Sequence, residues 1–172
     1  MPGSASAMVA IVHYHEISLK GGNRPLFLRQ LQQNLLRAMK DGLAPGQVRR
    51  GLRLLPRVME AMEGFCRLIG KEIYLIEPLF YHSAILYERR GCGYLMGKDV
   101  MEGIQAGFAE GGALRRALDG SSAFRQPGAE LTARGRSWAI HDGAAGPAWG
   151  GVKMYKACGR DAGVNTFPGG LY

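Results

Sequence analysis

Cysteine is scarce in this chain, and its spacing does not suggest a metal or disulfide site. The three cysteines, Cys66, Cys92 and Cys158, are odd in number, widely separated and form no Cys-x-x-Cys pair. We therefore expect neither a disulfide framework nor a zinc ribbon, and a reducing compartment such as the cytoplasm fits best. A run of about 18 apolar residues is also missing, so no membrane-spanning helix and no membrane partner are predicted.

Side chains suited to catalysis or metal binding are few. His13 and His15 would point to the same side of a strand, but a zinc site needs a further ligand, so no metal is expected. Cys92 follows Arg89 and Arg90, which could lower the pKa of its thiol, although no histidine partner is indicated. A small enzyme that uses Cys92 stays open as an alternative function.

Acidic residues are also in short supply. Lys and Arg total 22 against 14 Asp and Glu, which gives a net charge of +8 and a pI near 9.7. Residues 1–60 alone hold nine basic and three acidic residues, and therefore +6 of that excess. A basic segment of this kind favours a polyanionic partner, chiefly nucleic acid or an anionic membrane surface. A solvated basic surface without a partner is the alternative.

The strongest local pattern predicts a helix over residues 24–41. Asn23 is a good N-cap, and Gly42 suits the position that follows a helix. Arg37 and Lys40 would lie near the negative end of the helix dipole. The apolar residues recur at steps of three and four and would share one face: Phe27, Leu28, Leu31, Leu35 and Met39.

The elements around this helix suggest a small mixed fold. We predict a strand at 8–20, a second helix at 58–70 and a short strand at 72–76. The order strand, helix, loop, helix, strand suits an α+β sandwich with helices on one side of a sheet.

The second half of the sequence is rich in glycine and poor in periodicity. A strand at 80–87 and a helix at 99–118 are predicted, and the pattern fades beyond 119. Residues 91–172 hold 18 of the 26 glycines. This composition predicts a long irregular or poorly ordered tail.

The richest motif lies where the first strand meets the helix, within residues 13–27. A Gly21-Gly22 break separates the two elements, and Lys20 and Arg24 flank it. Free N–H groups at a helix start, beside two cations, make a phosphate-sized anion site. A plain strand-to-helix turn is the alternative.

This segment resembles the start of the tRNA 4-thiouridine synthetase family, the ThiI-like tRNA sulfurtransferases. The family pattern is a strand, then Glu-Ile-x-Leu-Lys-Gly-x-Asn-Arg, then Phe three residues on and a Leu-rich helix. The chain matches it at Glu16, Ile17, Leu19, Lys20, Gly21, Asn23, Arg24 and Phe27. The resemblance implies a ferredoxin-like domain at residues 8–78 and a partial THUMP-like domain at 79–172, which together hold tRNA.

The candidate RNA contacts combine this resemblance with the charge pattern. They are Lys20, Asn23, Arg24, Arg49, Arg50 and Arg53. Arginine guanidinium groups suit phosphate oxygens. If helical, Arg49, Arg53 and Arg57 would share one face, but Gly51 and Pro56 oppose a continuous helix. A solvated loop is the alternative for this second cluster.

Shorter similarities to the family continue beyond the helix. They are Met101–Ile104, Glu130–Leu131, Ala139–Asp142 and Thr166–Leu171, the last of which resembles the link to the family's catalytic domain. Between these segments the family pattern is missing. One hypothesis is a gene reading that slips frame, which would put residues 143–150 out of frame.

The resemblance implies RNA recognition without sulfur transfer. The family's catalytic domain opens with an ATP-pyrophosphatase loop, Ser-Gly-Gly-x-Asp-Ser, which this sequence lacks. ATP and Mg²⁺ are therefore expected only for that domain, and a cysteine desulfurase would supply sulfur to the full-length enzyme. Two alternatives stay open: the recognition module of another THUMP-bearing tRNA-modification enzyme, and a non-functional fragment or frame-shifted reading.

Overall fold

The computed structural model describes residues 24–47, 49–146 and 149–172. The chain divides into two compact units, Met1–Gly51 and Leu52–Tyr172, here called unit 1 and unit 2. Within the described part of the chain, no helix is both long and apolar enough to cross a bilayer.

The described part of unit 1 is dominated by helix α2, Arg24–Lys40, which confirms the helix predicted over 24–41. Its end has the hydrogen bonds of a Schellman motif: Gly42 N–H donates to Met39 O at 3.0 Å and Leu43 N–H to Ala38 O at 3.0 Å. Gly42 has φ +72°, a left-handed backbone conformation that residues with a side chain rarely adopt. The predicted strand at 8–20 lies outside the described residues.

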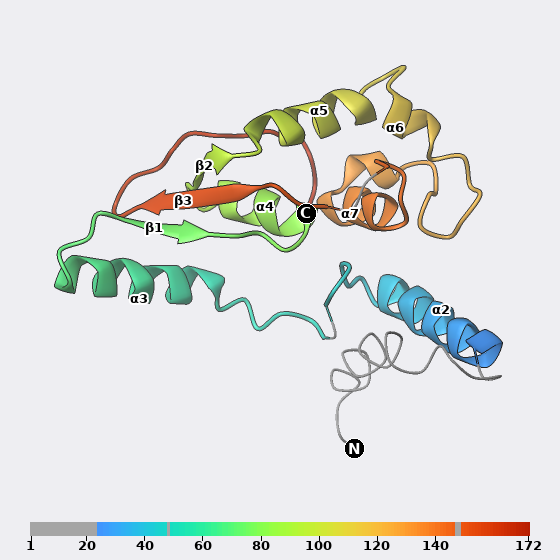
Figure 1. Cartoon of the computed structure of the whole chain (residues 1–172), viewed down its shortest axis with the longest axis horizontal. Helices are drawn as coiled ribbons and strands as arrows, with labels where there is room; N and C mark the ends of the chain where they lie inside the picture. Colours follow the sequence, from blue (N-terminus) through green and yellow to red (C-terminus); the bar gives the residue numbers. More distant parts are fainter. Residues whose placement is uncertain (1–23, 48, 147–148) are drawn as a thin grey trace. The chain divides into compact units, whose positions relative to one another are not determined.

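Unit 2 is an α+β unit built on one small antiparallel sheet (Figure 1). Strand β3 (Lys153–Ala157) runs between β1 (Ile73–Ile76) and β2 (Gly93–Met96), so the last strand in sequence is central. The helices are α3 (Leu55–Leu68), α4 (Tyr81–Glu88), α5 (Lys98–Phe108), α6 (Ala113–Arg116) and α7 (Ala133–His141), with a 3₁₀ turn at Ala129–Leu131. The helix predicted at 58–70 and the strand predicted at 72–76 are confirmed as α3 and β1.

The core of unit 2 forms between the sheet and helices that include α4 and α5. Met154 of β3, Tyr81 and Ile85 of α4, and Met101 and Phe108 of α5 are almost completely buried in one apolar cluster. Aromatic and long aliphatic side chains of this kind supply most of the free energy gained by burial.

The strand predicted at 80–87 is wrong, because this segment forms α4. Its aromatic and β-branched residues suggested a strand, but its buried positions follow a helical spacing: Tyr81, Ala84, Ile85 and Glu88. Local propensity is a weak guide when a short segment is buried on several sides.

The helix predicted at 99–118 is interrupted. It forms α5 and the short α6, with a break at Gly111, whose φ is +73°. A side chain at Gly112 would lie 2.2 Å from the carbonyl oxygen of Gly107, so this close turn needs glycine.

The irregular tail predicted beyond residue 119 is corrected by α7 and β3, which are both integral to unit 2. Glycine here marks the turns between short elements. Gly128 precedes the 3₁₀ turn with φ +93°, and Gly143 follows α7 with φ +86°. A high glycine content therefore reflects many tight turns in this unit.

The boundary between the two compact units lies after Gly51, well before the domain boundary that was expected between residues 78 and 79. Strand β1 pairs with β3 in the register Ile73↔Ala157 to Ile76↔Met154, which places it in the same sheet as the later strands. The division into a ferredoxin-like domain at 8–78 and a THUMP-like domain at 79–172 stays a prediction.

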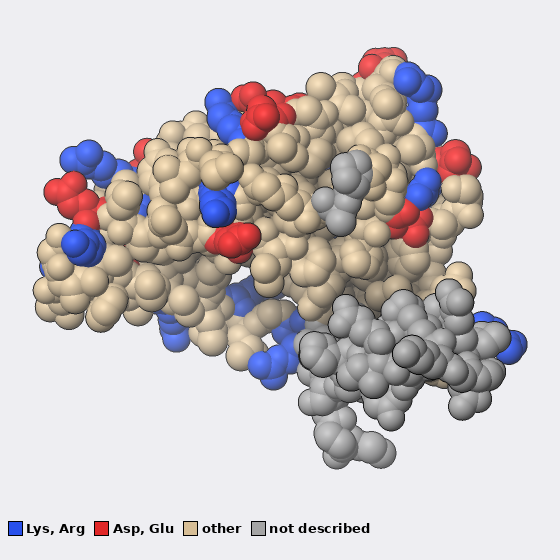
Figure 2. All heavy atoms as spheres, viewed as in Figure 1, with Lys and Arg blue, Asp and Glu red and all other residues tan. Residues whose placement is uncertain are grey.

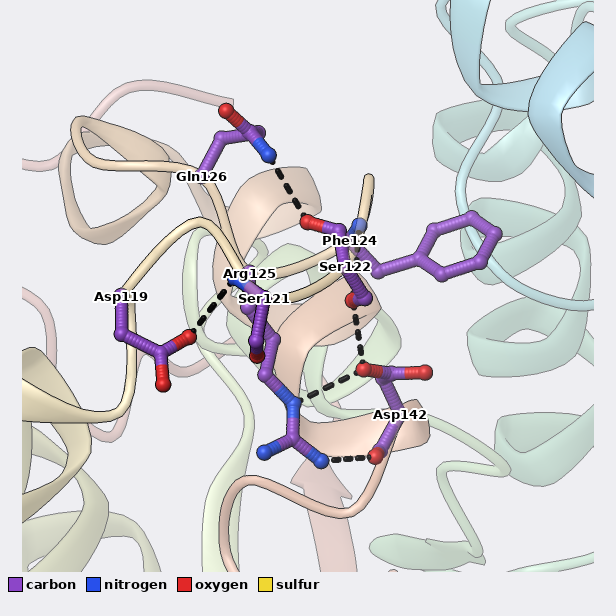
Figure 3. A network of polar contacts seen from close by, with 7 residues as sticks. All are labelled: Asp119, Ser121, Ser122, Phe124, Arg125, Gln126 and Asp142. Carbon is purple, nitrogen blue, oxygen red and sulfur yellow. Dashed lines mark hydrogen bonds and ion pairs between the residues drawn. The ribbon is translucent and has the colours of Figure 1, made fainter.

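The loop before the 3₁₀ turn is held to the end of α7 by a polar network (Figure 3). The Arg125 Nε–H donates to Asp142 Oδ2 at 2.8 Å, and Ser122 Oγ–H donates to the same oxygen at 2.7 Å. Phe124, in the same loop, stacks on Trp138 with ring centroids 5.0 Å apart. The short segment of similarity at Ala139–Asp142 therefore corresponds to the last turn of α7 and to Asp142, which binds the loop before the 3₁₀ turn.

The segment that resembles an interdomain link packs closely on unit 2. Glu88 is buried, and its carboxylate accepts hydrogen bonds from Thr166 N–H at 3.0 Å, Thr166 Oγ–H at 2.6 Å and Tyr94 O–H at 2.6 Å. The Phe167 side chain is buried in the core, and Leu171 pairs with Thr132 in an isolated parallel bridge. Thr166–Leu171 is thus part of the folded unit.

Replacing Thr166 by Val should destabilise unit 2 by about 1.5–3 kcal/mol, because a hydrogen bond to a buried carboxylate is lost. Urea unfolding followed by tryptophan fluorescence measures the free energy. Thr166→Ser keeps the hydroxyl and serves as the control. A free energy of unfolding for Thr166→Val equal to that of the unmodified chain would show that this hydrogen bond does not stabilise the unit.

Limited trypsin digestion should cut between residues 49 and 57 and leave the rest of unit 2 intact. Arg49, Arg50, Arg53 and Arg57 are exposed there, whereas β1 and β3 hold the rest together. Mass spectrometry of the fragments identifies the cuts, with urea-unfolded protein as the control. Trimming to about residue 80 would contradict the structure and favour a C-terminal half that does not fold.

Candidate nucleic-acid interface

A polar stripe with three cations runs along the exposed side of α2. Arg29, Gln33, Arg37 and Lys40 are all exposed and are spaced at four, four and three residues, which places them on one face. Eleven residues separate the first from the last, and at 1.5 Å per residue this is about 16 Å of helix. From the sequence, Arg37 and Lys40 were assigned only a favourable interaction with the helix dipole. The period of the helix, about 3.6 residues, also predicts that they share one exposed stripe.

The second basic cluster is exposed but not helical. Arg49 and Arg50 follow the turn after α2, and Arg53 lies before α3 with φ +57°. The helical arrangement of Arg49, Arg53 and Arg57 is not formed, since only Arg57 lies in a helix. Arg49 and Arg50 belong to unit 1 and Arg53 to unit 2.

The anion site expected at the start of α2 falls largely outside the described residues. Lys20 and Asn23 are not among them, and of Arg24 the structure describes only its place as the first residue of α2. These three RNA contacts stay predictions.

Charge separates the two units. Residues 24–51 carry six Lys or Arg and one acidic residue, Asp41, whereas residues 52–172 carry 15 and 12. On the face shown in Figure 2, acidic and basic side chains of unit 2 lie next to one another. Among its ion pairs are Arg125–Asp142 at 2.8 Å and Lys98–Glu102 at 3.2 Å. The excess of basic over acidic residues is therefore greatest in residues 24–51, which favours a polyanionic partner there.

The alternative of an enzyme that uses Cys92 is contradicted by the environment of its thiol. Cys92 is completely buried, and this burial raises its pKa to about 11, although Lys156 acts in the opposite direction. The prediction that Arg89 and Arg90 lower this pKa is wrong, because both side chains are exposed while the thiol lies in the core. A protonated, enclosed thiol is a poor nucleophile.

The histidine in the core of unit 2 is also structural in character. His82 Nδ1 lies 3.0 Å from Ser137 Oγ, and burial lowers the pKa of His82 to about 4, so the ring is neutral at physiological pH. In the described part of the chain, no three His, Cys, Asp or Glu side chains gather as metal ligands do. His13 and His15 lie outside that part.

Comparison with known proteins points to the same segment as the sequence motif. The family profile of the ThiI ferredoxin-like domain matches residues 9–51, about a quarter of the chain. The match ends where unit 1 ends, at Gly51. The chain has no significant match among curated proteins or among solved structures. Residues 9–51 are therefore similar to the N-terminal region of ThiI proteins, which is associated with tRNA modification.

A thiol reagent such as Ellman's reagent should modify Cys158 first and spare Cys92 in the native protein at pH 8. Cys158 is only half-buried and can be reached by the reagent. Cys92 is buried, and pH 8 is about three units below its pKa, so only about one Cys92 thiol in a thousand is ionised. Cys158→Ser should remove the fast phase and Cys92→Ser should not. A fast phase that disappears with Cys92→Ser would restore the reactive-cysteine interpretation.

Proposed function

We propose that unit 1 binds tRNA and that the chain is the RNA-recognition portion of a ThiI-related tRNA uridine 4-sulfurtransferase. The observation that carries this proposal is the match of residues 9–51 to the ThiI ferredoxin-like domain. The exposed cations of α2 and of the segment after it supply the charge that such binding needs.

The physical basis of binding is phosphate neutralisation. Arg29, Arg37 and Lys40 share a face of α2, and Arg49 and Arg50 are exposed nearby in sequence. Each contact to a phosphate releases condensed counterions, which gives affinity without reading the base sequence. Folded RNA is then selected by the shape in which it presents its phosphates.

Sulfur transfer is assigned to a different part of the enzyme. An ATP-pyrophosphatase domain would bind ATP and Mg²⁺, and a cysteine desulfurase would deliver sulfur to it. The proposed compartment is the cytoplasm, where tRNA is available. For residues 79–172 the THUMP-like, RNA-binding interpretation is supported by short sequence similarities, and the proposal places the main RNA contacts in unit 1.

A recognition module of another THUMP-bearing enzyme would share the RNA-binding property. The Glu16-Ile17 to Asn23-Arg24 motif and the matched domain favour the thiolation family. A sulfurtransferase assay would separate the two: the full-length gene product should convert uridine to 4-thiouridine, and a methylated product would favour the alternative.

Titration of unfractionated tRNA against the whole chain at several salt concentrations tests the proposal. If unit 1 neutralises four or five phosphates, the slope of log K against log salt should be roughly −3 to −5. Arg37→Ala/Lys40→Ala should make this slope shallower by about 1.5 to 2, and Lys20→Ala/Arg24→Ala should act similarly.

The matched control removes two exposed cations from unit 2. Lys153→Ala/Arg160→Ala lowers the net charge by the same amount as the α2 variant. Its slope should stay within the error of the unmodified chain. An equal change in both variants would indicate general attraction to a basic protein, and a slope near zero for the unmodified chain would overturn RNA binding.

A further inference from the structure

A pocket of about 250 Å³ lies in unit 2, and none of the residues that line it is assigned to RNA. Its lining comes from three separate parts of the sequence: α5 and α6, the turn before α7 with α7 itself, and the segment after Thr166. The volume is below the ~300–1,000 Å³ of sites for drug-sized ligands, so only a small molecule would fit.

Arg136 of α7 is the central polar residue of this pocket. Its side chain is 4% exposed, and its hydrogen bonds go to neutral acceptors. Nε donates to Glu130 O at 2.7 Å, and Nη1 donates to Gln105 Oε1 at 2.6 Å and to Tyr81 O–H at 3.3 Å. Its guanidinium carbon lies 3.8 Å from the ring centroid of Phe167 and 4.9 Å from that of Phe108. The group is thus fixed between two aromatic rings.

This buried cation has no countercharge. Among the described residues, no carboxylate lies within 4.0 Å of the Arg136 guanidinium, and Nη2 has no hydrogen-bond partner. A buried charge that is not paired is costly, and its cost falls when an anion binds next to it. Because Arg136 lines the pocket while Nε and Nη1 are occupied, Nη2 is the nitrogen available to a ligand.

The remaining charges of the lining favour a single negative charge. Arg115 lies in the same pocket and pairs loosely with Glu130, with Nε and Oε1 3.8 Å apart. Arg136, Arg115 and Glu130 together give the lining a net charge of +1. A monoanion matches this charge, whereas the Glu130 carboxylate would repel a phosphate dianion. Leu131 and Phe167 supply apolar walls for the body of the ligand.

The rim of the pocket is held in place before any ligand arrives. Arg89 Nη2 donates to the carbonyl oxygen of Gly170 at 2.6 Å, and Leu171 N–H donates to Leu131 O at 3.1 Å. A side chain at Gly170 would lie 2.2 Å from the Phe167 ring, so glycine is needed for the rim to close over that ring. A site fixed in advance loses little entropy on binding.

We propose that this pocket binds a small organic monocarboxylate, with its carboxylate on Arg136 and Arg115 and its apolar body against Phe167 and Leu131. This site is independent of RNA binding by unit 1. The wall chemistry suits an aromatic or branched aliphatic acid of metabolite size.

Benzoate and benzamide are matched probes for this site, because they share a shape and differ in charge. In ¹H–¹⁵N spectra of the whole chain, benzoate should shift the amide signals of Gly169 and Gly170 until the site is saturated. Benzamide should bind at least tenfold more weakly, and so should inorganic phosphate. Equal shifts with benzamide, tighter binding of phosphate, or shifts that do not saturate would overturn the proposal.

Variants connect the binding to the two arginines. Arg136→Met keeps an unbranched apolar stem and removes the charged guanidinium group, so it should abolish benzoate binding. Arg115→Ala should weaken benzoate binding about fivefold, and Arg116→Ala, its exposed neighbour on α6, should leave it unchanged. If Arg136→Met does not fold, the comparison of Arg115→Ala with Arg116→Ala decides. Equal affinity in those two variants would overturn the site.

Discussion

The pairing of β3 with two strands at once is the constraint on which unit 2 depends. Met154, the second residue of β3, is opposite both Ile76 of β1 and Tyr94 of β2 and is completely buried. Among the residues that the structure describes, β3 is the only strand that pairs with either outer strand. The close fit extends to Gly93, where a side chain would lie 2.7 Å from the Tyr155 ring. The sheet, and the burial of Met154 in the core cluster, depend on this one pairing.

The sequence predicted those elements that carry their own local signals. Helix α2 has a regular apolar stripe and a glycine stop, and α3 and β1 have clear apolar periods bounded by Pro and Gly. Helix α4 and strand β3 were missed because both are short and are defined by tertiary partners. In β3, the buried Lys156 interrupts the apolar pattern, and its ammonium group donates to the carbonyl oxygen of Arg160 at 2.5 Å. Such a bond has no signature in sequence.

The candidate sites divide in the same way. The exposure of Arg49 and Arg50 could be predicted from a loop rich in Gly and Arg, and the structure agrees. The environment of Cys92 could not be predicted, because the residues next to it in sequence are not those that surround its thiol in the fold. The carboxylate pocket could not be predicted from the sequence either, because its lining brings together Gln105, Arg136 and Phe167 from distant segments. Arginine thus occurs in two environments. On α2 it is exposed and accessible from solvent, and in unit 2 Arg136 is enclosed and held by aromatic rings.

The late position of β3 in the chain also has a consequence for synthesis on the ribosome. Fifty-six residues separate the end of β2 at Met96 from the start of β3 at Lys153. At roughly 5–20 residues per second, the two outer strands wait about 3–11 s for their common neighbour to be translated. During that interval β1 and β2 lack the strand with which they pair in the folded unit, so their backbone edges stay unpaired until β3 emerges.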